Sequence, residues 1–290
     1  MDNDIISRTN NTPLCITEIQ QAEYKILCAV VDLLENNRLN YILCGGTMLG
    51  AVRHNGFIPW DDDVDLLVPR KDYEQLKLIA RDSNREVDSF RICLPGDKYY
   101  PYPFIKVVDD SYTVIDERVI DECPISLWID IFPLDHFPDE EEKHRKHVKR
   151  VRFLRTLLEA GILKKNVYWE PLLIKNTGRR LKYSIKLFLY RLMGEYQGLA
   201  LLIDFIARKM NEGYADSHHF GDGVWPEGLK DYFESESVFP VVKHRFVERC
   251  FNITKNYDSY LKQFYGDYMQ FPPEDKRRGH SNLIIKNTID

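Results

Sequence analysis

Apolar residues recur at helical spacing in two stretches near the start of the chain. In residues 17–37 they follow a three- and four-residue period after Thr17 and Gln20, which stand at capping-box spacing. This pattern predicts an amphipathic helix begun at Thr17. Residues 70–82 have the same period and predict a surface helix. Its apolar face consists of Tyr73, Leu76, Ile79 and Ala80.

Short apolar runs between turn residues predict strands. The first run, residues 40–44, ends at Gly45 and Gly46, and a short helix begun by Thr47 follows it. A second strand is predicted at residues 64–69. Further extended segments are predicted at residues 102–108, 112–116 and 125–132. Helices that alternate with strands in this way indicate an α/β (α+β) domain built on a mixed sheet.

The pattern changes near Pro138. Residues 139–215 are helical and basic, with a break at residues 168–173, whereas the rest of the chain reads as short strands and one short helix. We therefore expect a core of residues 1–138, a basic helical insertion of residues 139–215, and a C-terminal segment of residues 216–290 that returns to the core.

Charge is distributed unevenly along the chain. Residues 143–191 contain fifteen Lys and Arg against two acids and carry +13, so the remainder carries -18 within a net charge of -5. Two interpretations of this basic segment stay open. Its helices could lie on an anionic membrane or an anionic acceptor, or they could be packed helices with basic exposed faces.

Several classes of protein are excluded by composition. No run approaches the ~18 apolar residues of a membrane span, and the first residues lack the basic and apolar blocks of a signal peptide. We expect a cytoplasmic protein, with peripheral contact at the inner face of the plasma membrane as the open alternative. The six cysteines show no zinc-binding spacing. A pI near 5.9 and the lack of a recognised motif argue against nucleic acid as a partner.

Four aspartates stand at the mouth of the second strand, in the sequence IPWDDDVDLLV. Side chains at i and i+2 of a strand share a face, so Asp63 and Asp65 are expected to point together while Val64 faces the core. Two adjacent carboxylates repel each other unless a cation joins them. Oxygen ligands without His or Cys suit Mg²⁺, with Mn²⁺ as the alternative.

Other interpretations of these acids were weighed. A solvated acidic run remains open, whereas a calcium-binding EF-hand loop fails because it would need Gly and Glu where the chain has Leu66 and Asp72. A glycosyltransferase DxD motif remains the second candidate, although few residues precede it to form a nucleotide-binding half.

Two further features favour phosphate chemistry. Gly45 and Gly46 at a strand-to-helix turn would let phosphate oxygens approach the backbone N–H groups at the positive end of a helix dipole. Asp130, the acid within the apolar run SLWIDIF, is the candidate for a third carboxylate. Together these residues form the pattern of a nucleotidyltransferase fold.

The same residues resemble a known family. The stretch GGTMLGAVRHNGFIPWDDDVDLLVPRKDYEQL is similar to the signature of the LicD family of phosphocholine transferases, which includes the fukutin and fukutin-related proteins. Later segments, PFIKVVDD, WIDIFPLD and YLKQFYGDYMQFPPEDKR, follow in the family's order. The resemblance implies Mg²⁺-dependent transfer of a phospho-substituent from CDP-choline or a related donor to a hydroxyl of a glycan or teichoic acid precursor, expected to be lipid-linked, with release of CMP.

The resemblance also implies roles for individual residues. Asp63, Asp65 and Asp130 would bind the metal, and Asp130 could instead orient or deprotonate the acceptor hydroxyl. The remaining expected contacts to the donor are made by Gly45, Gly46, Thr47, Arg53, Trp60, Lys106 and His280. The family often ends its last block in Ser-His-His where this chain has RRGHSN, which weakens the case for His280.

Two points stay open at the level of sequence. Selection of choline would need an aromatic cage for the quaternary ammonium. Candidates for that cage are Trp60, Tyr99, Tyr100, Tyr102 and Trp128. A domain that binds a nucleotide or polyanion without catalysis is the alternative function.

Overall fold

The computed structural model describes residues 13–123, 125–174, 176–279 and 283–288. Its central sheet runs in the order β1-β2-β6-β5-β4-β3, with β7 added to β6, β8 to β7 and β11 to β5. The pair β2 and β6 is parallel and the other pairs are antiparallel, so the expected mixed sheet is confirmed. The strands are β1 (Ile42–Leu43), β2 (Asp65–Pro69), β3 (Glu86–Val87), β4 (Phe90–Cys93), β5 (Ile105–Asp116), β6 (Ile125–Phe137), β7 (His219–Asp222), β8 (Phe233–Glu234) and β11 (Leu283–Asn287).

Helix α1 (Ile16–Asn36) buries one face in the main core, as its period predicts. The predicted cap is wrong by two residues. Cys15 is the N-cap, and Glu18 reaches back to accept a hydrogen bond of 2.8 Å from its backbone N–H. Gln20 instead donates to the carbonyls of Ile58 and Asp61 at 3.0 and 2.8 Å, so α1 holds the loop that carries the aspartates.

Two other predicted boundaries differ in ways that matter for the site. Helix α2 (Gly45–His54) begins two residues before Thr47, which places both glycines in its first turn. Strand β2 begins at Asp65, so Asp63 lies in the preceding loop and not in the strand. Helix α3 (Arg70–Asp82) has the predicted bounds.

Strand β5 contains most of the two extended segments predicted at residues 102–108 and 112–116, and β6 contains the third, predicted at residues 125–132. In β6, Leu127, Ile129 and Ile131 belong to the main core. Since alternate side chains point to opposite faces, Asp130 and Phe132 lie on the other face of the sheet. That face carries the site.

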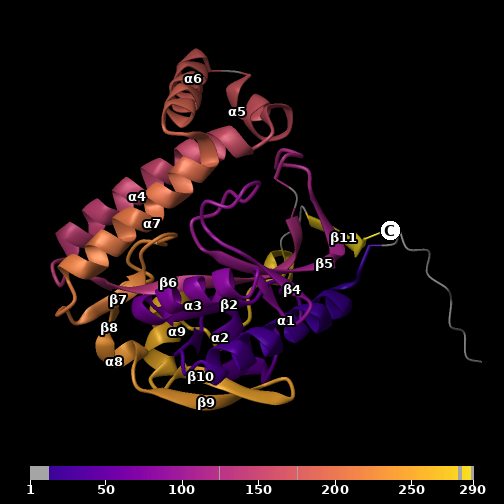
Figure 1. Cartoon of the computed structure of the whole chain (residues 1–290), viewed down its shortest axis with the longest axis vertical. Coiled ribbons are helices and arrows are strands. Elements are labelled where there is room, and N and C mark those ends of the chain that lie inside the picture. The colour runs from indigo at the N-terminus through magenta and orange to yellow at the C-terminus, as the bar shows by residue number, and fades with distance from the viewer. Residues whose placement is uncertain (1–12, 124, 175, 280–282, 289–290) are drawn as a thin grey trace, which may run out of the picture.

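Four consecutive helices form a projection from the sheet (Figure 1). Helices α4 (Glu141–Ile162) and α7 (Glu195–Gly213) run side by side away from the sheet, and α5 (Glu170–Leu173) and α6 (Thr177–Leu192) lie at the far end. A short π-helical turn, Lys165–Trp169, precedes α5. None of the helices among the described residues has the length and apolar character to cross a membrane.

The chain returns to the sheet after α7. Strand β7 pairs with β6, and β11 pairs with β5. Between them, a separate hairpin of β9 (Val241–Phe246) and β10 (Arg249–Thr254) packs its phenylalanines into the main core. Short helices complete this part: α8 (Ser235–Val238), α9 (Tyr257–Tyr265) and a 3₁₀ turn at Glu274–Lys276.

Candidate functional site

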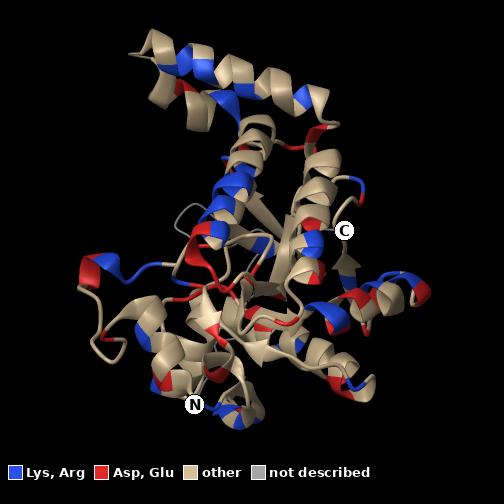
Figure 2. Ribbon diagram, turned by 90° about the vertical axis from the view of Figure 1, so that its left-hand side faces the viewer, with Lys and Arg blue, Asp and Glu red and all other residues tan. Residues whose placement is uncertain are grey.

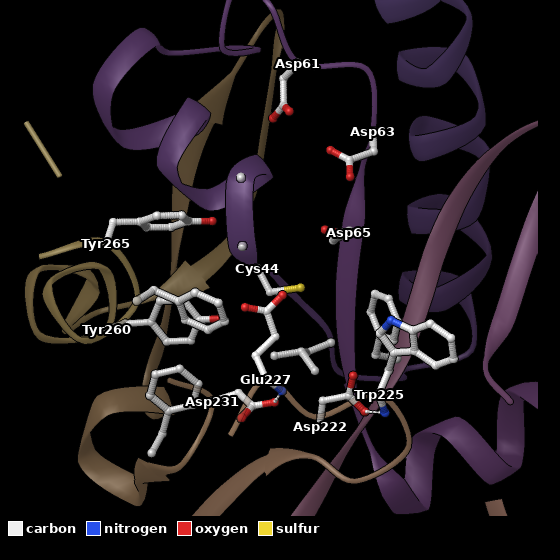
Figure 3. A pocket seen from close by; sticks show the side chains of 16 residues that line it. Cys44, Asp61, Asp63, Asp65, Asp222, Trp225, Glu227, Asp231, Tyr260 and Tyr265 are labelled. Atoms are coloured by element: carbon white, nitrogen blue, oxygen red, sulfur yellow. Dashed lines mark hydrogen bonds between the residues drawn. The ribbon is translucent and has the colours of Figure 1, made fainter. Parts of the chain in front are cut away.

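A cavity of about 290 Å³ opens over the face of the sheet that carries Asp65 (Figure 3). Leu67 and Phe132 form its floor from the adjacent parallel strands β2 and β6, where they are paired in register. Six acids line it in two groups, one from the loop before β2 and the first residue of β2, and one from the last residue of β7 and the segment after it. They are Asp61, Asp63, Asp65, Asp222, Glu227 and Asp231.

The first end of the cavity is the turn into α2. Gly45 has a φ of +53°, which favours glycine, and a Cβ there would stand 3.3 Å from Asp65 Oδ2. At Gly46 a Cβ would stand 2.7 Å from Asp61 Oδ2, which is too close. Bare backbone at both positions therefore lets carboxylates, or groups bound by them, approach the N-terminus of α2.

Thr47 does not open the helix but fixes it to the neighbouring strand. Its side chain is buried, and its hydroxyl accepts a 2.9 Å hydrogen bond from the backbone N–H of Asp65. The expected contact of Thr47 with a donor stays a prediction, since the observed hydrogen bond already explains the residue.

Asp61, Asp63 and Asp65 all contribute to the cavity wall, as Figure 3 shows. Asp61 was not among the site residues predicted from the sequence. Period-two alternation does place Asp61, Asp63 and Asp65 at equivalent positions, but only Asp65 is in the strand. The loop conformation set by Gln20 brings the other two to the same cavity.

The electrostatics of this acidic end are unfavourable without a bound cation. Burial raises the pKa of Asp65 well above its ordinary value, and the neighbouring charges of Asp63, Asp130 and Asp61 raise it further. Glu23 of α1 is buried behind the same loop, and its pKa is also raised, first by burial and then by the loop aspartates. Glu23 was not predicted from sequence, because its position in α1 reads as a polar residue of an amphipathic helix.

Asp130 is placed next to Asp65 by the parallel register of β2 and β6. Its carboxylate accepts a 2.6 Å bond from Lys106 Nζ and a 3.2 Å bond from Trp128 Nε1. Asp130 is not among the described residues that line the cavity. Its metal-binding or catalytic role stays a prediction, and the observed geometry gives it an ion-pair partner instead.

Lys106 was expected to contact the donor phosphates. It is 4% exposed, and its ammonium lies 4.2 Å from the ring centroid of Trp128 and 4.8 Å from that of Tyr102. Two of the five residues considered for a choline cage therefore converge, but around the chain's own lysine.

Whether the acids suit Mg²⁺ can be judged from the donor set. Among the described residues, no group of three or more His, Cys, Asp and Glu side chains is arranged to hold a metal ion. Mg²⁺ is ordinarily held by one or two carboxylates together with substrate phosphates and water, and not by a full protein cage. Asp63 and Asp65, with Asp61 beside them, fit that requirement.

Arg53 and Trp60 line a neighbouring cavity, separate from the acidic one. In it, the Arg277 guanidinium lies 5.4 Å from the ring centroid of Trp60 and 5.6 Å from that of Phe271. Tyr265 lines both cavities. The last predicted residue, His280, lies outside the described residues.

The second end of the acidic cavity was missed from the sequence. Asp231 is 5% exposed, its Oδ1 has no hydrogen-bond partner, and burial raises its pKa. Asp222 accepts hydrogen bonds from the backbone of Val224 and Trp225, yet burial raises its pKa to about 7. The spacing of these acids along GDGVWPEGLKD follows no strand or helix period, so only the fold brings them together.

Aromatic rings surround these acids. Trp225, Phe233, Tyr260, Phe264 and Tyr265 line the same cavity. An acidic cavity end with aromatic walls suits an organic cation, whose charge would favour the ionised form of these carboxyl groups.

Comparison with known proteins supports the resemblance to LicD-type transferases. Residues 38–156 match the LicD/FKTN/FKRP nucleotidyltransferase domain. The chain is 28% identical over 284 residues to the lipopolysaccharide cholinephosphotransferase LicD of Haemophilus influenzae, covering 92% of this chain and 96% of that protein. It is 42% identical over 69 residues to the human and mouse ribitol 5-phosphate transferase FKRP, covering 22% of this chain and 13% of that protein.

The matched domain contains the turn at Gly45, the loop aspartates and Asp130, whereas the second group of acids lies outside it. The resemblance seen in the sequence is thereby confirmed. Residues 38–156 therefore carry a LicD/FKTN/FKRP nucleotidyltransferase domain, and nearly the whole chain is similar to a transferase of the LicD type.

Proposed function

We propose that this protein transfers phosphocholine, or a similar phospho-substituent, from a CDP-activated donor to a hydroxyl of a cell-surface glycan or teichoic acid precursor and releases CMP. The observation that carries the proposal is the acidic cavity, in which the glycine turn and the loop aspartates stand at one end and an anionic, aromatic site stands at the other. Such a cavity matches a donor that has a diphosphate with its metal on one side and an organic cation on the other.

The glycine turn would hold the diphosphate. The first-turn N–H groups of α2 lack partners within the helix and carry the positive end of its dipole. Asp63 and Asp65 would hold Mg²⁺ against the same phosphates. When bound there, Mg²⁺ would neutralise charge on the diphosphate and stabilise the departing CMP.

The cytidine would occupy the neighbouring cavity. Trp60 and Phe271 offer ring faces for the base, and Arg53 and Arg277 offer positive charge beside them. Because Tyr265 lines both cavities, a nucleotide in one and a phosphocholine group in the other can belong to one donor molecule.

The choline group would lie among Asp222, Glu227 and Asp231. Trimethylammonium has no hydrogen-bond donor, so it is recognised by negative charge and by aromatic faces, and Trp225 and Tyr260 line the cavity beside these acids. Arg155 of α4 stacks on Trp225 at 3.7 Å from the ring centroid and holds that ring in place.

The acceptor hydroxyl must then attack phosphorus in line with the departing CMP. Asp61 lines the same cavity as Asp63 and Asp65 and is a carboxylate that could accept the hydroxyl proton. Asp130 stands beside Asp65 on the neighbouring strand and would act indirectly: its ion pair with Lys106 limits the negative charge at the site.

The transferase claim is tested by CMP release. Purified protein is incubated with Mg²⁺, a glycan or teichoic acid acceptor, and CDP-choline, CDP-ethanolamine or CDP-ribitol, and CMP is measured by chromatography. We expect CMP from CDP-choline, lost on chelation of the metal and reduced at least about 100-fold by Asp65→Asn. Asp62→Asn, in the same acidic run but outside the cavity lining, is the matched control and should stay near the wild-type rate.

Absence of CMP from every CDP donor would contradict the proposal. Transfer of a sugar from a nucleotide sugar would support a glycosyltransferase in its place. Donor binding without turnover would support the non-catalytic alternative.

The choline site is tested separately by donor choice. Asp231→Asn and Trp225→Leu should raise KM for CDP-choline about tenfold, because each removes an attraction for the cation. Turnover of a neutral donor such as CDP-ribitol should change little. Equal losses with both donors would show that these residues do not recognise the ammonium group.

A further inference from the structure

Helix α6 carries a row of exposed apolar side chains at the far end of the helical projection. Leu181, Ile185, Phe188 and Leu192 follow one another at intervals of four, three and four residues. They are 63%, 50%, 66% and 71% exposed. A continuous apolar stripe of this kind on a protein surface marks an interaction site.

The stripe is not the face by which α6 packs on the protein. Tyr183 and Tyr190, on the opposite side of the helix, are buried. The Tyr190 ring fills the space beside Gly161 of α4, where a Cβ would come within 2.1 Å of it. Tyr183 donates a 3.3 Å hydrogen bond to the carbonyl of Ala160. The helix therefore has one apolar face for α4 and a second that is left exposed.

Basic side chains flank the exposed stripe. Residues 163–192 contain eight Lys and Arg and one acid, Glu170. On the helical wheel, Lys182 and Arg191 lie on either side of the stripe, about 90° from its centre. Neither makes an ion pair among the described residues, and both are exposed. Their charges are available to an anionic partner.

We propose that this face of α6 docks on the surface of an anionic lipid bilayer. A helix with an apolar face between rows of Lys and Arg lies in the membrane interface, where its apolar side chains enter the headgroup region and its cations meet lipid phosphates. A second copy of the chain is disfavoured as the occupant, because two basic ends would repel each other.

The placement of α6 suits this role. Figure 2 shows α6 lying crosswise over the ends of α4 and α7, at the top of the molecule, so its long side faces outward. In the neighbouring α5 segment Leu172 and Ile174 are also exposed, at 46% and 62%.

Docking by this face would also bring the cavity near the lipid surface. Arg155, which stacks on Trp225 of the cavity, lies seven residues before the end of α4. At 1.5 Å per residue this is about 10 Å along the helix axis, and α6 adds a thickness of about 10 Å. An acceptor attached to a lipid would therefore need to extend only about 20 Å from the membrane.

The test is vesicle flotation with the full chain. Vesicles of phosphatidylcholine alone are compared with vesicles that also contain phosphatidylglycerol, over a range of salt concentrations. We expect binding to the anionic vesicles only, weakened by salt. The double variant Lys182→Glu/Arg191→Glu should bind about 25-fold more weakly, since each cation near the surface contributes roughly fivefold. Phe188→Ser should also weaken binding.

Matched control variants show whether the position of the substituted charges matters or only the net charge of the protein. Lys71→Glu/Arg81→Glu changes the net charge equally on α3, and Leu78→Ser removes a 51% exposed apolar side chain there. These variants should bind vesicles as the wild type does. Loss of binding in the controls as well, equal binding to neutral vesicles, or no binding at low salt would overturn the proposal. So would a dimer in sedimentation that Phe188→Ser dissociates. None of these outcomes depends on CMP release.

Discussion

Replacement of Asp65 by Asn should stabilise the metal-free protein while it removes the activity. Asp65 is a half-buried carboxylate whose neighbours in the cavity wall, Asp61 and Asp63, are also acidic. Lys106, whose charge opposes the rise in the pKa of Asp65, is already bonded to Asp130. Asn keeps the shape of the side chain and removes one charge from this group.

The size of the effect follows from Coulomb's law. Two carboxylates about 6 Å apart repel each other by about 3 kcal/mol at an effective dielectric constant of 20. Lys106 offsets part of this repulsion, so we expect Asp65→Asn to raise the free energy of unfolding by about 1–2 kcal/mol. For a chain of this length, that is a rise in Tm of about 1.5–2 °C per kcal/mol.

The stability gained by Asp65→Asn should depend on pH. The pKa of Asp65 is raised in the folded protein, so the folded state binds this proton more tightly than the unfolded chain does. Stability of the wild type is therefore lost as the pH rises from the ordinary aspartate value near 4 through the raised value. The variant has no such group, so its advantage should vanish at low pH and be largest above neutrality.

Thermal unfolding in a chelator measures this directly, at about pH 8 and at about pH 5. Asp62→Asn is the control, because it removes the same charge at a residue outside the cavity lining. Equal stabilisation by both variants would mean that the repulsion is spread over the whole acidic run. A destabilised Asp65→Asn protein at both pH values would refute the reasoning.

Three further predictions concern single contacts. Lys106→Met should cost about 2–3 kcal/mol of stability, because the half-buried Asp130 carboxylate loses its lysine, and Lys106→Met/Asp130→Asn should recover most of it; an additive double variant in denaturant unfolding would contradict the pairing. Gly46→Ala should displace the Asp61 side chain and raise KM for CDP-choline about tenfold with little change in Tm, whereas an unchanged KM would show that this end of the cavity does not meet the donor. The buried Arg70 of α3 pairs with the buried Asp135 and Asp204 at 2.6 Å each. Arg70→Met should cost about 3–5 kcal/mol in the same unfolding assay, because it leaves both aspartates without their shared guanidinium, and a cost below about 1 kcal/mol would show that this network contributes little.

Local patterns in the sequence predict much of the core. The period of residues 70–82 gives α3 its observed bounds, and the short apolar runs locate β1 and β2. The predicted ends of helices and strands are wrong where a tertiary contact sets them. Helix α2 begins at Gly45 and not at Thr47, because the Thr47 hydroxyl is engaged by β2. The length of β5 and β6 is likewise set by pairing with several partners, which no local period records.

The site likewise contains some residues that the sequence predicts and others that only the fold brings together. Gly45, Gly46, Asp63 and Asp65 form a contiguous motif, and the structure brings all four to one cavity. Residues that join the site from distant segments were not predictable. Glu23 reads as a surface position of a helix, and Asp231 belongs to a loop without a period, so only the folded chain places them near the motif.

The most direct test of the central claim is to locate the metal and the donor together. Crystals of the protein grown with CDP-choline and Mn²⁺ would give an anomalous signal at the metal. The account predicts that signal between Asp63 and Asp65, with the diphosphate on the Gly45–Gly46 turn and the trimethylammonium group beside Asp231. A metal bound elsewhere, or a donor bound outside the acidic cavity, would contradict it.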